Sequence, residues 1–194
     1  MSFSDKFFNE VVDIANNIDK NKVERLVDNL YSIRHNKGRV FVLGVGGSAG
    51  NASHMVNDFR KLCGIETYAP TDNVSEITAR TNDEGFDTIF EEYLKVSNFN
   101  ANDAIFVLSV GGGDKDRNVS VALIKAIDYV KSRSGTVLGI VGKPDGYTAT
   151  AGNCVVVIPP IQPNRVTPHS EAFQAVVWHS IVSNPKLQVN KTKW

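Results

Sequence analysis

The segment Phe41–Cys63, FVLGVGGSAGNASHMVNDFRKLC, predicts how this protein folds. A predicted strand over residues 39–43 runs into this segment and ends at closely spaced glycines. The chain then restarts as a helix, with Ser48 where an N-cap is expected. The glycines of this turn are Gly44, Gly46 and Gly47. A strand, a glycine turn and a helix direct backbone N–H groups toward an anion, usually a phosphate. The segment therefore predicts an α/β unit with an anion-binding turn.

Two chemically active side chains follow on the same predicted helix. His54 and Asp58 are four residues apart, so both lie on one helical face. An imidazole beside a carboxylate is suited to proton transfer or to metal binding.

The rest of the chain alternates between helical and strand-like patterns. Helical spacing predicts two leading helices in residues 3–37, and short apolar runs then alternate with helices through residue 182. Near-continuous apolar runs are typical of parallel strands buried on both faces. The expected strands are 39–43, 65–68, 104–108, 136–141 and 154–158, and the expected helices are 49–62, 74–81, 86–97, 119–132 and 169–182. We predict a doubly wound parallel five-stranded sheet flanked by helices.

Length and charge limit the possible organisation and partners. The chain has 194 residues, enough for one well-buried domain, with a core at 39–182 and a polar tail at 183–194 whose Trp194 is expected to dock. Its 21 basic and 21 acidic residues balance, which argues against a nucleic-acid or membrane-surface partner. No signal-peptide pattern opens the chain, and Cys63 and Cys154 lie in apolar surroundings. We expect a cytoplasmic protein with buried free thiols.

Ligands of such sheets bind beyond the carboxyl ends of the strands. Besides the first glycine turn, the segment 109–118, SVGGGDKDRN, follows a strand there, whereas 142–146, GKPDG, is typical of an ordinary turn. On its own, a glycine triplet before a helix is a weak motif, and a flexible turn is the alternative interpretation.

The first segment resembles the signature of sugar isomerase (SIS) domains, in particular the phosphoheptose isomerase branch. Five residues match that pattern, namely Gly44, Gly46, Gly47, Ser48 and His54. Val45 replaces an asparagine of the pattern, and Asp58 replaces a glutamate. The resemblance implies a SIS domain over 1–194, with a flavodoxin-like strand order and leading helices used for oligomerisation. A homotetramer with sites at its subunit interfaces is expected.

The second glycine loop matches the family less well. Ser109, Gly112 and the pair 118–119 agree, but Val110 and Gly111 replace hydroxyl residues, Asp114 replaces a serine, and about two residues are inserted. Backbone amides of the segment 111–113 (Gly111, Gly112 and Gly113) remain available to a phosphate. Asp114 would repel that phosphate unless the neighbouring Lys115 and Arg117 offset its charge.

Two more stretches carry the resemblance. Asn82 and Asp83 are natural helix-cap residues, and the family places such a pair at the sugar site. The segment 167–179, TPHSEAFQAVVWH, has Glu171 and His179 at positions where relatives carry a glutamine and a histidine. Taken alone, His179 on an apolar helix is more often a hydrogen-bonded core histidine than a catalyst.

The resemblance implies an activity and a metal. The family shares one metal among four positions, which here are His54, Asp58, Glu171 and His179, so a divalent ion, with zinc the first choice, is expected. The implied activity is a phosphosugar aldose–ketose isomerase acting on sedoheptulose 7-phosphate or a related sugar phosphate. Asp58 and His179 would transfer the proton, and the glycine turns with Ser48 and Ser109 would hold the phosphate. The alternative is a catalytically silent SIS module that senses a sugar phosphate or binds a protein.

Overall fold

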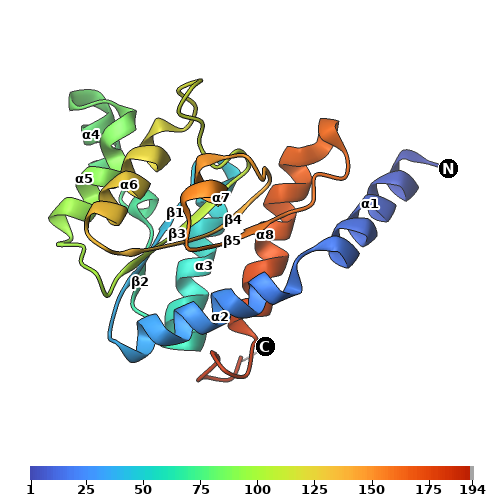
Figure 1. The fold of residues 1–194 in the computed structure, drawn as a ribbon, viewed down its shortest axis with the longest axis horizontal. Helices are drawn as coiled ribbons and strands as arrows, with labels where there is room; N and C mark the ends of the chain where they lie inside the picture. The colour runs from blue at the N-terminus through green and yellow to red at the C-terminus, as the bar shows by residue number, and fades with distance from the viewer. Residues whose placement is uncertain (193–194) are drawn as a thin grey trace.

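The computed structural model describes residues 1–192, and the expected docking of Trp194 lies outside them. Five parallel strands form one sheet in the order β2-β1-β3-β4-β5, which confirms the predicted doubly wound arrangement (Figure 1). The strands are β1 Val40–Leu43, β2 Thr67–Tyr68, β3 Ala104–Ser109, β4 Thr136–Val141 and β5 Cys154–Val157.

The strands carry apolar side chains on both faces because helices cover the sheet from both sides. In β1, Val40 and Val42 contact one hydrophobic core, whereas Phe41 and Leu43 contact the other. Successive side chains of a strand point to opposite faces, so a strand between two helical layers needs an unbroken apolar run.

The helices divide between the two faces of the sheet. Residues of α2, α3 and α8 build the first core, and residues of α5 and α6 build the second. The helices are α1 Phe3–Asn17, α2 Lys20–His35, α3 Gly47–Cys63, α4 Val74–Asp83, α5 Ile89–Val96, α6 Val121–Ser132, α7 Tyr147–Ala151 and α8 Val166–Val182, with short 3-10 turns at Pro70–Asp72, Phe86–Thr88 and Pro163–Arg165. The short helix α7 was not predicted, because five residues after a glycine turn are too few for a visible helical period.

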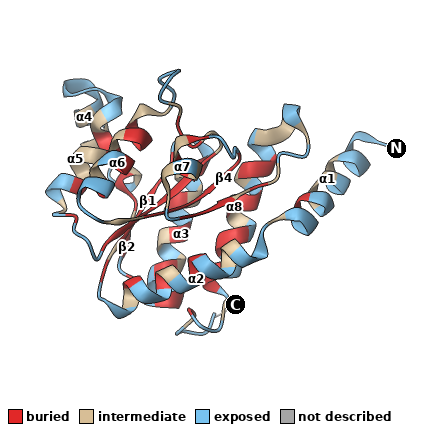
Figure 2. Cartoon of the chain, viewed as in Figure 1, coloured by how far each residue is buried: buried red, intermediate tan, exposed pale blue. Residues whose placement is uncertain are grey.

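Helix α1 projects from the body of the protein (Figure 1). Ser2 and Asp5 form a capping box at its start, and Ile14 is its one buried residue. Figure 2 shows α1 exposed along most of its length, unlike α3 and α8. Most of the surface of α1 is therefore not covered by other parts of this chain.

The order of the strands places the functional loops. Strand β1 lies between β2 and β3, so the chain turns to opposite sides of the sheet after β1 and after β3. The turn at 44–46 and the loop at 110–120 leave the carboxyl ends of these two neighbouring strands. In residues 1–192, no helix is long and apolar enough to cross a membrane.

Candidate active site

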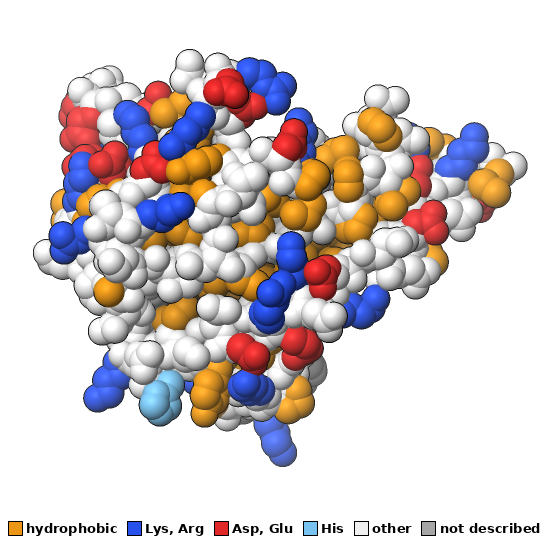
Figure 3. Space-filling model, viewed as in Figure 1, with side chains coloured by type: hydrophobic (Ala, Val, Ile, Leu, Met, Phe, Trp, Pro, Cys, Tyr) orange, Lys and Arg blue, Asp and Glu red, His pale blue; other side chains and the backbone are white. Residues whose placement is uncertain are grey.

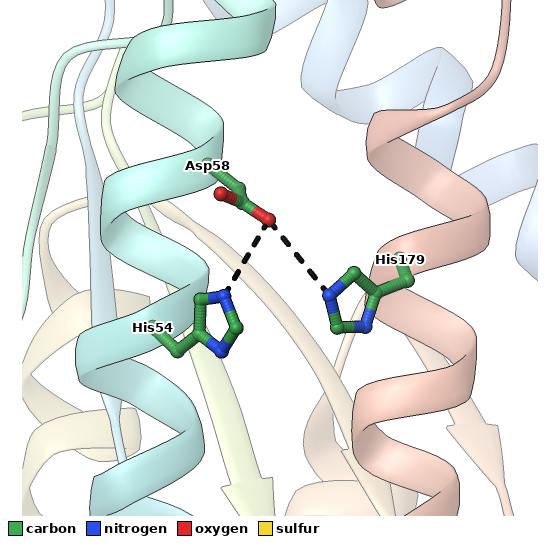
Figure 4. A group of neighbouring side chains, drawn as sticks. All are labelled: His54, Asp58 and His179. Carbon is green, nitrogen blue, oxygen red and sulfur yellow. Dashed lines mark ion pairs between the residues drawn. The ribbon is translucent and has the colours of Figure 1, made fainter. Parts of the chain in front are cut away.

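Three of the predicted site residues meet between α3 and α8. His54 and Asp58 come from α3, and His179 comes from α8 (Figure 4). Asp58 Oδ2 lies 3.9 Å from His54 Nε2 and 3.9 Å from His179 Nε2. The two imidazole rings are 5.4 Å apart, centroid to centroid, and nearly perpendicular. We refer to these three residues as the triad.

Two of the three triad side chains, Asp58 and His179, are oriented by a hydrogen bond to a neighbour. Asn57 Nδ2 donates to Asp58 Oδ1 at 2.8 Å, so the other carboxylate oxygen faces the two histidines. His179 Nδ1 lies 2.8 Å from the backbone oxygen of Ala175. A carbonyl only accepts, so this contact assigns the proton of neutral His179 to Nδ1 and leaves the lone pair on Nε2, toward Asp58.

A buried tryptophan packs against both rings. Trp178 is fully buried, stacks on His179 at 3.5 Å between ring centroids, and meets His54 edge-on at 4.7 Å. The histidines themselves stay exposed, with 59% and 50% of their side-chain surface accessible for His54 and His179. His179 is therefore not the core histidine that its apolar helix alone suggested, and a ligand can reach it.

The triad has the donor set of a metal site. One ligand atom from each residue lies within 4.8 Å of the other two. Two imidazoles and a carboxylate are a common set for zinc, and three protein ligands leave a position open to substrate. The bond from His179 Nδ1 to a backbone carbonyl is the contact by which proteins orient a ligating histidine. The residues present therefore fit a divalent ion.

Glu171, the fourth predicted ligand, is not part of this group in a single chain. It lies eight residues before His179 on α8, which corresponds to about 12 Å along the helix axis. Its carboxylate instead faces Gly47 at the start of α3, where a Cβ added to Gly47 would meet Glu171 Oε2 at 2.6 Å. The prediction of four converging ligands is corrected to three within one chain.

The first glycine turn differs from the prediction in one respect. Gly46, with φ 63°, is the N-cap, and α3 begins at Gly47, so Ser48 is not the capping residue. Gly46 adopts a positive φ that a residue with a side chain rarely takes. Ser48 lies inside the first turn of the helix and is 2% exposed.

A buried amide that sequence reasoning did not select ties this turn to α8. Gln174 is fully buried, and its Nε2 donates to Ser48 Oγ at 3.1 Å. Asn51 Nδ2 donates to Gln174 Oε1 at 2.9 Å and to the backbone oxygen of Glu171 at 3.0 Å. The signal in the sequence was a glutamine among apolar residues at a core-facing position of α8. Ser48 Oγ thus accepts one hydrogen bond in a polar network between α3 and α8, and its own O–H remains available as a donor.

The second glycine loop is well ordered. Ser109 Oγ accepts from Gly112 N at 3.0 Å, and Gly112 and Gly113 take φ values of 75° and 90°. Their carbonyl oxygens accept from the N–H groups of Thr148 and Tyr147 at the start of α7. The loop is therefore fastened to α7, which argues against a flexible turn. Gly111 and Gly113 line a pocket of about 100 Å³ with Arg117 and Lys143.

Asp114 also lines that pocket, but its charge is paired with Arg117. Its carboxylate accepts from Arg117 N and Nε, at 2.9 and 2.6 Å, within a small hairpin closed by the bridge between Asp114 and Val119. The hydrogen bond from the Arg117 backbone, followed by the one from its side chain, lowers the pKa of Asp114. Lys115 instead pairs with Asp128 on α6 at 2.9 Å.

Asn82 and Asp83 do not cap the following helix as predicted. They are the last two residues of α4, both are exposed, and Asn82 Nδ2 donates to Asp83 Oδ1 at 2.7 Å. Gly85 precedes the next helical turn in their place. Figure 1 places α4 at the opposite side of the protein from α8, so this pair does not meet the triad within one chain.

Known proteins resemble this chain in sequence. The sequence model of the SIS domain family matches residues 6–142. A phosphoheptose isomerase from Trichlorobacter lovleyi is 32% identical over 146 residues, which are 73% of this chain and 69% of that protein. A lincomycin biosynthesis protein from Streptomyces lincolnensis is 28% identical over 158 residues, or 78% of this chain, but the match spans only 57% of that longer protein.

The fold is similar to a solved relative as well. The structure of a phosphoheptose isomerase from Neisseria gonorrhoeae superposes with a TM-score of 0.79 and 21% identity, covering 93% of this chain and 96% of that one. The matched region of the sequence includes β1, both glycine loops and the first two triad residues. The chain therefore belongs to the SIS domain family.

Proposed function

We propose that this protein is a phosphosugar aldose–ketose isomerase, with sedoheptulose 7-phosphate or a related sugar phosphate as its substrate. The observation that carries the proposal is the triad, in which Asp58 Oδ2 and His179 Nε2 lie 3.9 Å apart on the wall of a pocket of about 340 Å³. The similarity to phosphoheptose isomerases supports the same class of substrate.

Isomerisation moves a proton between two neighbouring carbons through an enediol. Asp58, fixed by Asn57, is the base that removes the proton beside the carbonyl. His179, whose Nε2 lone pair is free when no metal occupies it, exchanges the proton of the adjacent oxygen. The two groups are close enough to serve adjacent atoms of one substrate. Asp58 is shorter than the glutamate of the family pattern, and its Oδ2 still lies 3.9 Å from both His54 Nε2 and His179 Nε2.

The triad also holds the metal in this proposal. His54, Asp58 and His179 would bind a divalent ion, zinc being the first choice, and the ion when bound would polarise the carbonyl oxygen of the substrate. His54 faces the pocket and has no role in the proton transfer itself. A substitution of His54 would therefore weaken metal binding without removing an acid–base group.

The remaining site residues are proposed as contacts to the sugar in an assembled oligomer. They are Gly46, Gly47, Ser48, Asn82, Asp83, Ser109, Gly111, Gly112, Gly113 and Glu171. We further propose a homotetramer located in the cytoplasm, where the buried Cys63 and Cys154 stay reduced.

A coupled assay with sedoheptulose 7-phosphate tests the function. We expect turnover by the wild type and a loss of about 10²-fold or more in kcat for Asp58→Asn and for His179→Ala. His35→Ala is the matched control, because His35 is exposed at the end of α2. Sugar-phosphate binding without turnover would instead support the silent sensing module.

A further inference from the structure

His54 is the member of the triad whose orientation no hydrogen bond fixes. Asp58 and His179 are each held by a hydrogen bond to a neighbour. Neither ring nitrogen of His54 has such a partner among residues 1–192, and its Nε2 lies 3.9 Å from Asp58 Oδ2, which is too far for a hydrogen bond. Proteins normally orient a metal-ligating histidine through a hydrogen bond to its second ring nitrogen. A contact of another kind must therefore orient this ring.

An imidazole without such a contact would turn. The His54 side chain is 59% exposed, and for histidine the rotation about the bond between Cβ and the ring is broad and roughly two-fold. Half a turn about that bond carries Nε2 away from Asp58 and puts a ring carbon in its place. The three ligand atoms of the triad therefore stay together only if the plane of the His54 ring is fixed.

The contact that can fix this plane is the indole ring of Trp178. It meets the His54 ring edge-on, with centroids 4.7 Å apart and an angle of 68° between the planes. The same indole stacks on His179, with centroids 3.5 Å apart and an angle of 28°. The two imidazole planes are in turn 84° apart. One rigid aromatic ring thus contacts both imidazoles and sets the angle between them.

The indole is itself fixed by the core of the protein. Trp178 is fully buried in the first core, which α2, α3 and α8 build against the sheet. A close-packed interior holds a side chain of this size in one rotamer. The two histidines, by contrast, are half exposed or more. The buried ring therefore passes the order of the core to two side chains that the core does not cover.

The polar atom of Trp178 indicates that this side chain is not there for packing alone. Its Nε1–H is buried and has no hydrogen-bond partner among residues 1–192. A buried N–H without a partner costs free energy, and a leucine or phenylalanine would fill core space without that cost. Natural sequences break local rules of this kind mainly at functional sites. A wide aromatic ring that reaches both histidines is a reason to keep the indole.

We propose that Trp178 is a positioning residue, whose indole holds the imidazoles of His54 and His179 in the geometry needed for metal binding and proton transfer. Trp178 is not among the residues that line the triad pocket, the pocket of about 340 Å³ at His54, Asp58 and His179. It therefore acts through the two histidines and not on the substrate. For its effect on turnover, this inference rests on the proposed isomerase function.

Zinc affinity tests the role of Trp178 without any turnover. In competition titrations with a chromogenic chelator, Trp178→Leu should bind zinc about tenfold or more weakly than the wild type, as expected when an orienting partner of a metal ligand is lost. Trp178→Phe keeps an aromatic ring on the same Cβ and should recover most of that affinity. An equal loss in Trp178→Phe and Trp178→Leu would overturn the proposal, because the aromatic ring would then not be the cause.

Phe106→Leu is the matched control for a lost ring in the same core. Phe106 is fully buried in the first core, and its ring meets Phe59 and neither histidine of the triad. It should bind zinc as the wild type does, and a loss equal to that of Trp178→Leu would show general loosening of the core instead. Trp178→Met, which fills more space without an aromatic ring, replaces Trp178→Leu if the leucine variant does not fold.

Nuclear magnetic resonance of the metal-free protein tests the geometry itself. The chain has four histidines, so their ring signals can be assigned by single replacements. An indole shifts the signals of protons held beside it, so the ring signals of His54 and His179 should move toward their unfolded values in Trp178→Leu. The signals of His169, which is buried against Phe7 of α1, should stay and so confirm that the variant is folded. Unchanged His54 signals would overturn the proposal.

Turnover separates this inference from the proposed function. With a sugar phosphate that the wild type converts, Trp178→Leu at saturating zinc should lower kcat about tenfold or more and leave KM within about threefold, because Trp178 does not contact the substrate. Weaker zinc binding and shifted histidine signals, without turnover by the wild type, would count against the isomerase alone. Turnover by the wild type, with kcat and zinc affinity unchanged in Trp178→Leu, would count against the role of Trp178 alone.

Discussion

At the scale of single residues, the chemistry depends on which side chains share the triad. Sequence similarity placed Glu171 with His54, Asp58 and His179, but α8 turns it toward Gly47 instead. We therefore expect Glu171→Gln to leave zinc affinity within about twofold of the wild type. His54→Ala, Asp58→Asn and His179→Ala should each lower it by tenfold or more, since each removes one of three ligands. Competition titrations with a chromogenic chelator would measure this, and an equal loss in Glu171→Gln would restore the four-ligand site.

Gly47 is constrained by the same carboxylate. A Cβ at Gly47 would lie 2.6 Å from Glu171 Oε2, whereas a Cβ at Gly50, three residues on, meets nothing within 4 Å. We expect Gly50→Ala to stabilise the protein by up to about 1 kcal/mol, as alanine does inside a helix. Gly47→Ala should show none of this gain, because the Glu171 side chain must move. Urea denaturation measures the unfolding free energy of both variants. If the Glu171 carboxylate is the cause, the double variant Gly47→Ala with Glu171→Ala should recover the gain in stability.

Gln174 is the buried polar residue that holds α3 to α8. Replacing it with leucine would leave the Ser48 hydroxyl without its Gln174 partner, and Asn51 Nδ2 would keep only the backbone oxygen of Glu171 as an acceptor. We expect Gln174→Leu to lower the free energy of unfolding by about 1–3 kcal/mol, despite the gain in apolar surface. Gln162→Leu, at a half-buried position before α8 where the side chain accepts only from Asn164 N, is the control. Equal stability of the two variants would show that the network contributes nothing.

At the scale of elements, the sequence predicted the strands better than the ends of the helices. An apolar run such as 104–108 predicts both the presence and the position of a strand, and β3 is found at Ala104–Ser109. Caps were harder to predict, because a cap depends on the path of the chain. Ser48 has the right chemistry for an N-cap, yet Gly46 takes that position since the turn needs a positive φ. The partners of Glu171 and Gln174 depend on how α3 packs on α8, which no local pattern records.

Helix α1 is fastened to α8 by an ion-pair cluster with a defined pH dependence. Glu10 accepts hydrogen bonds from Arg165 and lies 2.7 Å from His169 Nε2. The bond from Arg165, followed by that from His169, lowers the pKa of Glu10 from 4.5 to about 2. A carboxylate whose pKa is lower in the folded than in the unfolded protein stabilises the fold at pH values above the unfolded pKa. This stabilisation is lost as the pH falls through the folded pKa.

We therefore expect the stabilisation by Glu10 to be complete above about pH 5 and to disappear between pH 4.5 and 2. Glu10→Gln should remove it, so the difference in unfolding free energy between wild type and variant should shrink across this window. Glu24→Gln, an exposed residue of α2, is the comparison variant. A difference that stays constant from pH 6 to pH 3 would show that the cluster does not anchor α1.

At the scale of the whole molecule, α1 and α8 present apolar surface that the single chain leaves open. Phe3, Phe8 and Val12 of α1 are 66%, 67% and 56% exposed, and Val176 of α8 is 57% exposed. A groove of about 320 Å³ between the leading helices and α8 is lined by apolar residues that include Ile18, Val23, Phe173 and Val177. Figure 3 shows hydrophobic side chains gathered where α1 leaves the body of the protein. Surface of this kind marks an interface.

The proposed tetramer follows from this surface and is tested by breaking it. Phe8→Asp or Val12→Asp places a charge in the expected contact, where burying it without a partner is costly. We expect light scattering at micromolar concentration to show a tetramer for the wild type and smaller species for these variants. Val96→Asp, on α5 and 69% exposed in the single chain, should leave the mass unchanged. A monomeric wild type would exclude sites shared between subunits. The sugar contacts proposed for Asn82 and Asp83 would then have no route to the triad, and the substrate would be held by the triad pocket of a single chain.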